Sequence, residues 1–406
     1  MYRIGAVARD YAWGSTTAIA DFLGVPPTGA PCAEVWLGAH PSAPSPLLHS
    51  DGATDAAPPA RPGRDLRSLI AADPIAALGA EVAARFDSTL PFLVKLLAPA
   101  QAVSLQVHPG AEQARETFAQ QQASGIVFED PSRGFKDPFH KPEMVYALTP
   151  FRGLVGFRDR VESAELLGRL DVAVLAPVVA QLSGEDDRAV ERAFTLLLTT
   201  ITADAVDEAV ERSAVLARRH PAYAAVGEIA RHYPGDTGVV ASLMLNLVTL
   251  SPGEAVFVND GVPHAYLSGL ALEIMANSDN VIRAGLTVKH VDVPALLACA
   301  DFTDAAAVVL TGDLLGPDTR VFRPDAAEFA LAVITSSVTT ATARPSASTV
   351  AQGGPSIVLA LSGELTIGTG ESALSLRPGE AAFLPASIGM QPVGGNGVLA
   401  QTFVPA

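Results

Sequence analysis

The stretch LSPGEAVFVNDGVPHAY, residues 250–266, returns later in the chain as LRPGEAAFLPASIGMQP, residues 376–392. In both copies a Pro-Gly-Glu turn leads into a short apolar run, a second turn and another run, with Pro252 aligned on Pro378. Short apolar runs bounded by turn residues are typical of β-strands. The last part of the chain is therefore predicted to contain two similar units rich in strands.

This order of turns and strands is the signature of a cupin-type jelly roll, a small double-sheet barrel that places ligands inside. The two copies differ at one informative position, because the first carries His264 where the second has Met390. The second barrel is therefore expected to bind no metal.

The rest of the chain alternates between strand-like and helical patterning, which predicts a mainly β fold with a helical insert. Short apolar runs fill residues 1–157, apolar residues at helical spacing fill 158–233, and strand-like runs then resume, beginning with 239–250. Helical pieces are expected at 74–86 and 293–302, and a surface loop at 50–65. The predicted domains are the N-terminal part of a catalytic barrel (1–157), a helical insert that forms an α-helical domain (158–233), the second part of the catalytic barrel (234–315) and a C-terminal cupin-like barrel without metal (316–406).

Charge and cysteine content exclude several classes of protein. The 406 residues include 27 Lys and Arg and 43 Asp and Glu, a net charge of −16, which disfavours nucleic acid and anionic membranes as partners. Cys32 and Cys299 form no paired motif, so neither a disulfide framework nor a thiolate metal site is expected. The first residues, MYRIGAVARDYAWGS, lack the pattern of a secretory leader, and we expect a cytoplasmic protein.

The segment AVSLQVHPG, residues 102–110, alternates between polar and apolar residues as a strand does. Gln106 and His108 then share one face, while Val103, Leu105 and Val107 share the other and press into a core. The polar pair alone fits a solvated strand face.

Two further segments, HKPEMVYAL and GVPHAY, supply the partners that such a pair would need to bind a metal ion. Gln106, His108, Glu143 and His264 together offer two imidazoles, one carboxylate and one carboxamide, a suitable ligand set for zinc. No short-range motif links these residues, so polar residues satisfied within a sheet remain an equal alternative.

Basic residues near these segments add a second feature. If Glu143 faces a pocket, strand parity places Lys141 on the same face, where it could carry a proton; the alternative is a surface lysine. Arg283 and Lys289 share one parity in a segment expected to be extended, and such a pair can bind phosphate, unless the strand face is merely solvated.

The chain as a whole resembles the type I mannose-6-phosphate isomerases, zinc-dependent members of the cupin superfamily. The resemblance rests on YAWGS, AEVWLGAHPSAPS, PFLVKLLAPAQAVSLQVHP, FKDPFHKPEMVYAL and VFVNDGVPHAYLSGLALEIMANSDNVIRAGLTVKHVD, which lie between the N-terminus and residue 292. It covers nearly the whole chain, with the loop at 50–65 and the last barrel matching least well.

The resemblance implies interconversion of mannose 6-phosphate and fructose 6-phosphate through a cis-enediol, within mannose metabolism and the supply of precursors for GDP-mannose. It implies one Zn²⁺ per chain and a small sugar phosphate as partner. We also expect a monomer. The implied zinc ligands are Gln106, His108, Glu143 and His264; the implied catalytic residues are Arg283, Lys141 and Glu273; the implied substrate contacts are Trp13, Glu34, Ser104, Asp279 and Lys289.

Two other readings of the same residues stay open at this point. A metal-dependent cupin oxidoreductase of the dioxygenase kind would use a similar barrel, although such sites usually contain more histidines. A non-catalytic sugar-binding barrel is the other alternative, and it has no need for a lysine beside a metal.

Overall fold

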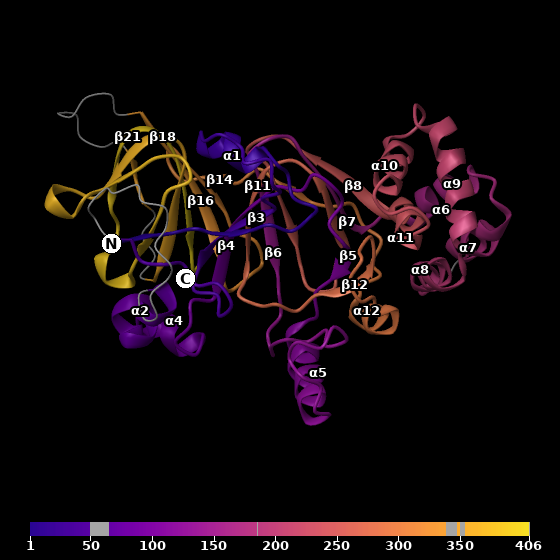
Figure 1. The fold of residues 1–406 in the computed structure, drawn as a ribbon, viewed down its shortest axis with the longest axis horizontal. Helices are drawn as coiled ribbons and strands as arrows, with labels where there is room; N and C mark the ends of the chain where they lie inside the picture. The colour runs from indigo at the N-terminus through magenta and orange to yellow at the C-terminus, as the bar shows by residue number, and fades with distance from the viewer. Residues whose placement is uncertain (49–64, 185, 338–346, 350–353, 406) are drawn as a thin grey trace.

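The computed structural model describes residues 1–48, 65–184, 186–337, 347–349 and 354–405. Three antiparallel sheets and a group of helices follow one another along the long axis of the molecule (Figure 1). The mainly β class expected from the sequence is confirmed. None of the helices in the described ranges has the length and hydropathy that a membrane-spanning segment needs.

Two of the sheets form the central barrel. In spatial order, the strands of its seven-stranded sheet are β13 (Val309–Leu310), β9 (Ala255–Val258), β6 (Glu143–Ala147), β11 (Ala271–Ala276), β4 (Phe92–Leu97), β3 (Glu34–Gly38) and β2 (Val7–Arg9). Those of its five-stranded sheet are β12 (Ile282–Gly285), β5 (Leu105–Val107), β10 (His264–Ser268), β7 (Phe151–Phe157) and β8 (Leu245–Leu250). Apolar side chains from both sheets meet between them, among them Val145 from β6 and Val155 from β7.

The third sheet forms the C-terminal barrel. Its main path is β1 (Tyr2–Ile4), β20 (Ala381–Leu384), β18 (Ser356–Ile367), β21 (Pro392–Phe403), β16 (Ala330–Ser337), β15 (Thr319–Phe322) and β14 (Asp313–Leu314), with β17 (Ala347–Ser348) beside β21 and β19 (Leu374–Leu376) beside β18. The barrel encloses its own apolar core, and Met390, the counterpart of His264, is exposed on its surface. Short 3₁₀ turns, η3 (Gly370–Ser372) and η4 (Ala386–Ile388), connect its strands.

The seven-stranded sheet is the wall of the central barrel that faces the C-terminal barrel, and its middle strands β4, β6 and β11 are buried on both faces. On β6, Val145 points into the central barrel, whereas Met144 and Tyr146 pack toward the C-terminal barrel. Four short helices also contribute to the apolar core between the two barrels: α1 (Ala18–Leu23), α2 (Leu66–Ala72), α3 (Pro74–Leu78) and α4 (Ala80–Arg85). The strand parity expected for HKPEMVYAL is confirmed.

Helices cover the outer face of the five-stranded sheet, where Leu105 and Val107 join the helical core. They are α6 (Arg160–Gly168), η1 (Ala173–Leu175), α7 (Ala176–Leu182), α8 (Ala189–Thr200), α9 (Ala203–Leu216), α10 (Pro221–Ala230), α11 (Thr237–Ala241), η2 (Ser242–Met244) and α12 (Val293–Cys299). Helix α5 (Ala111–Ala123) projects away from the sheets (Figure 1). The helix expected at 293–302 is confirmed.

Other local predictions need correction. The strand expected over 239–250 is wrong in its first half, because the Asp236 carboxylate accepts a hydrogen bond from Gly238 N and so begins α11. The helix expected over 74–86 is broken at Gly79, whose positive φ of 81° ends α3. Helix α5 had not been predicted. The loop expected at 50–65 lies outside the described residues apart from Asp65, the N-cap of α2.

Candidate metal centre and substrate pocket

Strand register brings the predicted metal ligands together. Gln106, at the middle of β5, pairs with His264 of β10 on one side and with Arg283 of β12 on the other. His108 follows β5 directly, and Glu143 opens β6 in the opposite sheet. The ligands therefore come from both walls of the central barrel, at the same end of it.

The side chains of His108, Glu143 and His264 are fully buried and point at one another. His108 Nε2 lies 3.2 Å from Glu143 Oε1, and His264 Nε2 lies 3.6 Å from Glu143 Oε2. Their ligand atoms all lie within 4.8 Å of one another, close enough for one ion to bind all three. This is the one such cluster found among the described residues.

The protonation of the two imidazoles suits metal binding. His108 Nδ1 donates to the carbonyl of Asn280 at 2.6 Å, and His264 Nδ1 donates to the carbonyl of Val262 at 3.0 Å. Both Nε2 atoms are therefore unprotonated, and that of His108 has no hydrogen-bond partner although it is buried. Burial lowers the pKa of His108 to about 3 and also lowers that of His264, which keeps both rings neutral.

Gln106 completes the set on the pocket side. Its Nε2 lies 3.2 Å from His264 Nε2, and its Oε1 accepts a hydrogen bond from Ser104 Oγ at 2.8 Å. A half-turn of the amide exchanges these two atoms, so Gln106 can present an oxygen to an ion and still bond to Ser104. An orphaned buried nitrogen, two neutral imidazoles, a carboxylate and an amide fit a divalent cation well.

Two further side chains hold the Glu143 carboxylate. Lys141 Nζ lies 3.0 Å from Oε1, and the hydroxyl of Tyr266 donates to Oε2 at 3.1 Å. Burial alone would raise the pKa of Glu143, but the ammonium group of Lys141 holds it well below its usual value. Lys141 thus lies beside the cluster, on the face that strand parity predicts.

A cavity of about 570 Å³ opens in front of the cluster. Its walls include ten of the twelve predicted site residues, namely Trp13, Glu34, Ser104, Gln106, Lys141, Glu143, Glu273, Asp279, Arg283 and Lys289. His108 and His264 lie buried behind this wall. Val103, expected in the core with Leu105 and Val107, is half-buried: it packs against the apolar cluster of the central barrel and also lines the cavity, because β5 begins only at Leu105.

One wall of the cavity carries a row of polar side chains on neighbouring strands. Trp36 of β3 pairs with Lys95 of β4, and Lys95 pairs with Glu273 of β11. Lys95 Nζ lies 2.8 Å from Glu273 Oε2 and 4.0 Å from Glu34 Oε1, and Trp36 Nε1 donates to Glu34 Oε2 at 2.6 Å. Burial, with the nearby carboxylates Glu143 and Glu34, raises the pKa of Glu273 although Lys95 opposes the shift.

Lys95, Trp36 and Tyr266 belong to the pocket but were missed in the sequence. The available signals were a lysine inside the apolar run PFLVKLL and a tyrosine two residues after His264. Neither signal specifies a pocket until the strands are paired, since Lys95 and Glu273 are 178 residues apart.

The opposite wall carries two cations without acidic partners. In the part of the chain that the structure describes, no ion pair reaches the side chain of Arg283 or Lys289, and Lys289 Nζ lies 5.3 Å from the centre of the Tyr11 ring. The extended segment expected through Lys289 ends at Gly285, because Leu286 adopts a positive φ of 54°. The two cations nevertheless line the same cavity.

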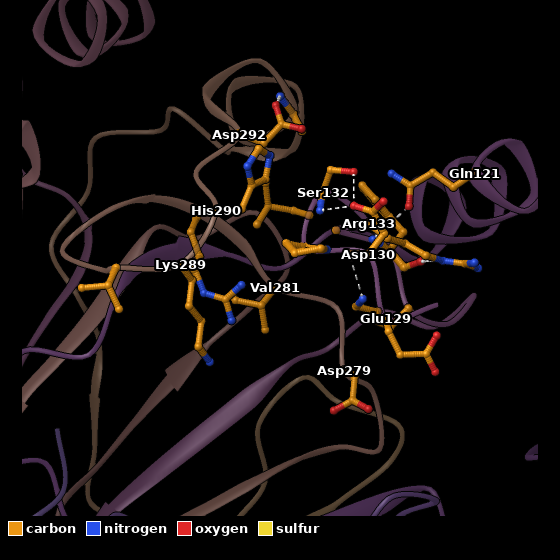
Figure 2. Close-up of a pocket in the computed structure, with 18 residues that line it drawn as sticks. Gln121, Glu129, Asp130, Ser132, Arg133, Asp279, Val281, Lys289, His290 and Asp292 are labelled. Atoms are coloured by element: carbon orange, nitrogen blue, oxygen red, sulfur yellow. Dashed lines mark hydrogen bonds between the residues drawn. The ribbon is translucent and has the colours of Figure 1, made fainter. Parts of the chain in front are cut away.

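A second cavity, of about 510 Å³, lies on the other side of these cations and shares Asp279, Val281, Arg283, Val288 and Lys289 with the first. Figure 2 shows Lys289 and His290 along one wall of it and Asp130, Ser132 and Arg133 along the other. Arg133 is occupied, because its guanidinium donates to the carbonyls of Ile126 and Phe135 and to the side chain of Gln122. In contrast to Arg133, the cations Arg283 and Lys289 on the shared wall can bind an anion.

Trp13 and Asp279 complete the surroundings of the first cavity. The Trp13 ring stacks on Tyr11 with centroids 5.7 Å apart. Asp279 Oδ1 lies 3.3 Å from His40 Nε2. All twelve predicted site residues therefore lie in or directly behind one cavity.

The jelly-roll fold and the buried two-histidine, one-carboxylate cluster define a metal-dependent enzyme of the cupin class. Comparison with known proteins gives the family. Residues 1–160 match the model of the phosphomannose isomerase type I catalytic domain. The mannose-6-phosphate isomerase of Escherichia coli (strain K12) is 36% identical over 403 residues, covering 97% of each chain.

Solved structures agree with this match. The apo form of the mannose 6-phosphate isomerase from Salmonella typhimurium and a zinc-bound mannose 6-phosphate isomerase each superpose with a TM-score of 0.86. Each is 33% identical in sequence, with 100% of this chain and 99% of the other covered. The chain belongs to the type I phosphomannose isomerases, as the resemblance in its sequence implied.

Proposed function

We propose that this chain interconverts mannose 6-phosphate and fructose 6-phosphate with one bound Zn²⁺. The observation that supports this proposal most strongly is the buried cluster of His108, Glu143 and His264. It faces a cavity whose wall carries two basic side chains without an acidic partner among the described residues. Membership of the isomerase family supports the reaction, and the zinc-bound relative supports the metal.

Gln106, His108, Glu143 and His264 would hold the ion. They contribute one negative charge, so the loaded centre keeps a net charge of about +1. Zinc, when bound there, supplies a Lewis acid that polarises the sugar oxygens and stabilises negative charge on them. Because Gln106 binds without adding charge, it preserves this effect better than a second carboxylate would.

The isomerisation needs a proton to leave C2 and a proton to return at C1 of the open-chain sugar, through a cis-enediol. We assign this proton transfer to Glu273 and Lys141. The raised pKa of Glu273 suits a group that must both accept and release a proton. Lys141, whose Nζ lies 3.0 Å from Glu143, also lines the cavity and can donate to a sugar oxygen.

Arg283 and Lys289 would bind the phosphate or, in the case of Arg283, stabilise enediolate charge. Both face the cavity without an acidic partner among the described residues, in a chain whose net charge is −16. Trp13, Glu34, Ser104 and Asp279 would contact the sugar, the first through its ring face and the others through its hydroxyls.

Metal removal tests the proposal directly. The metal content of the purified protein is measured first, and fructose 6-phosphate formation from mannose 6-phosphate is then followed before and after treatment with a strong chelator. We expect about one zinc per chain, loss of activity on chelation, and recovery on adding zinc. Full activity in a protein stripped of metal would refute the zinc assignment.

We also propose that the chain acts as a monomer in the cytoplasm and that its domains follow the predicted boundaries at residues 157, 233 and 315. The run of helices between β7, which ends at Phe157, and β8, together with the separate apolar cluster of the C-terminal barrel, supports this division. Light scattering that gives the mass of two chains would contradict the monomer.

A further inference from the structure

The loop after β12 carries Lys289 to the wall shared by the two cavities, and its conformation is unusual. Leu286 adopts a positive φ of 54°, which costs energy for any residue with a side chain. The next residues, Thr287, Val288 and Lys289, line the substrate cavity (Figure 2 shows Lys289). Something outside the loop must therefore hold Leu286 in this conformation.

Asp236, the N-cap of α11, makes the contacts that do so. Its Oδ2 accepts a hydrogen bond from Leu286 N at 2.8 Å, while its Oδ1 accepts one from Gly238 N at 2.7 Å. One carboxylate thus bonds both to the start of α11 and to the residue at which the loop turns. The side chain of Leu286 is fully buried in the helical core, which fixes the same residue from the other side.

The two backbones approach closely around this carboxylate. A Cβ on Gly285 would lie 2.6 Å from Asp236 Oδ1 and 3.3 Å from Gly238 Cα. Glycine is therefore required at position 285, and the loop is seated directly against the start of α11. At its other end the loop is closed by a hydrogen bond from Asp292 N to the carbonyl of Arg283.

We propose that Asp236 is a positioning residue for substrate binding: it fixes the Leu286–Lys289 loop so that Lys289 and Arg283 both face the phosphate of the substrate. This inference rests on the proposed function, since it requires that these two cations bind the phosphate. It also gives the start of α11 a part in substrate binding, although Asp236 touches no substrate itself.

Replacing Asp236 with Ser tests the inference, because Ser keeps the bond to Gly238 N but has no second oxygen for Leu286 N. A misplaced loop should weaken substrate binding and have little effect on the rate of the chemical step. The KM for mannose 6-phosphate should therefore rise about 10- to 100-fold. The inhibition constant of inorganic phosphate should rise in parallel, while kcat and zinc content stay close to those of the parent protein. Asp236→Asn, which also loses one acceptor, provides a second variant if the first fails to fold.

A matched control comes from Asp159, which caps α6 through Val161 N and Glu162 N and lines neither cavity. Asp159→Ser should leave KM and phosphate inhibition unchanged. Unchanged values in both Asp236 variants, with a raised KM in Lys289→Ala, would overturn the role of Asp236 and leave the phosphate assignment intact. Unchanged values in Lys289→Ala and Arg283→Ala as well would overturn the phosphate assignment, and the inference with it.

Discussion

At the residue scale, the orientation of the ligands depends on Asn280. Its carbonyl accepts the Nδ1 proton of His108, and its fully buried side chain donates to the carbonyls of Asp137 and Phe139. Its Oδ1 also accepts from Lys136 N and Asp137 N. One residue therefore ties the segment before β6 to the ring of a metal ligand.

Asn280→Ala keeps the backbone carbonyl that accepts from His108 but removes the side-chain hydrogen bonds that fix its position. We therefore expect zinc binding to weaken by about 10-fold, the lower end of the usual effect of disturbing a partner that orients a metal ligand. The affinity is measured by competition with a chromogenic chelator, which needs no catalytic activity. Asn277→Ala is the matched control, because Asn277 lies in the same turn and its Oδ1 has no partner. Equal affinities for the two variants would contradict this role of Asn280.

The sequence could predict individual site residues where their chemistry was distinctive. Histidines, a glutamate and a glutamine in three segments indicated a metal, and the family resemblance supplied the remaining members. Lys95 and Asn280 were missed because their importance lies in their partners. Lys95 meets Glu273, and Asn280 meets His108, only after strands far apart in the chain have paired.

At the scale of elements, close backbone crossings place the N-terminal segment over the pocket. Gly14 forms a bridge with Pro99, and a Cβ on it would lie 2.4 Å from Ala33 Cα. The neighbouring Trp13 lines the substrate cavity. The glycine of YAWGS thus allows the aromatic residue before it to lie against the barrel.

Gly14→Ala should lower the free energy of unfolding by about 1–3 kcal/mol, the usual cost of overpacking, and should raise KM through displacement of Trp13. Urea denaturation and steady-state kinetics measure the two effects. Gly227→Ala in the middle of α10 is the control, since nothing lies within 4 Å of its added Cβ. The Gly227 variant should be more stable than the parent protein by about 0.5–1 kcal/mol. A Gly14 variant as stable as this control would contradict the close approach of the backbones at Gly14 and Ala33.

The sequence predicted helices and strands correctly where apolar residues kept one regular spacing. It failed where a single hydrogen bond decides how the backbone folds. Alternation correctly placed Met144 and Tyr146 opposite Val145 on β6. It failed over 239–250, where apolar residues fit either period and the cap at Asp236 decided for a helix. It also failed after Gly285, because the turn at Leu286 depends on a carboxylate 50 residues earlier in the chain.

At the scale of the whole molecule, a half-buried charge cluster joins the two barrels. His140 Nδ1 lies 2.9 Å from Asp260 of the central barrel, and its Nε2 lies 2.8 Å from Glu328, just before β16 of the C-terminal barrel. These two hydrogen bonds raise the pKa of His140 to about 10. The imidazolium lies next to Lys141, so the C-terminal barrel supports the strand that carries a metal ligand.

The stability that this cluster adds should depend on pH. Since the pKa of His140 is raised on folding, its contribution is complete below about 6.5, the pKa in the unfolded chain, and is lost as the pH rises through about 10. Glu328→Gln should therefore cost about 1.5–3 kcal/mol at pH 6 and clearly less near pH 10. Urea titrations of both proteins at the two pH values measure this, and an equal difference at both would contradict the charged cluster.

The pairing of β1 with β20 has a consequence for how the chain is made. Residues 2–4 leave the ribosome early and can bridge to Leu47, but β20, the strand with which they pair, follows only at residues 381–384. At ordinary rates of synthesis this delay is on the order of 20 to 80 s. Until β20 has been made, β1 near the N-terminus and β18 near the C-terminus both lack it as a partner. The last barrel therefore closes only after translation is nearly complete. A fragment that lacks either end would keep an open strand edge permanently and would be prone to aggregate.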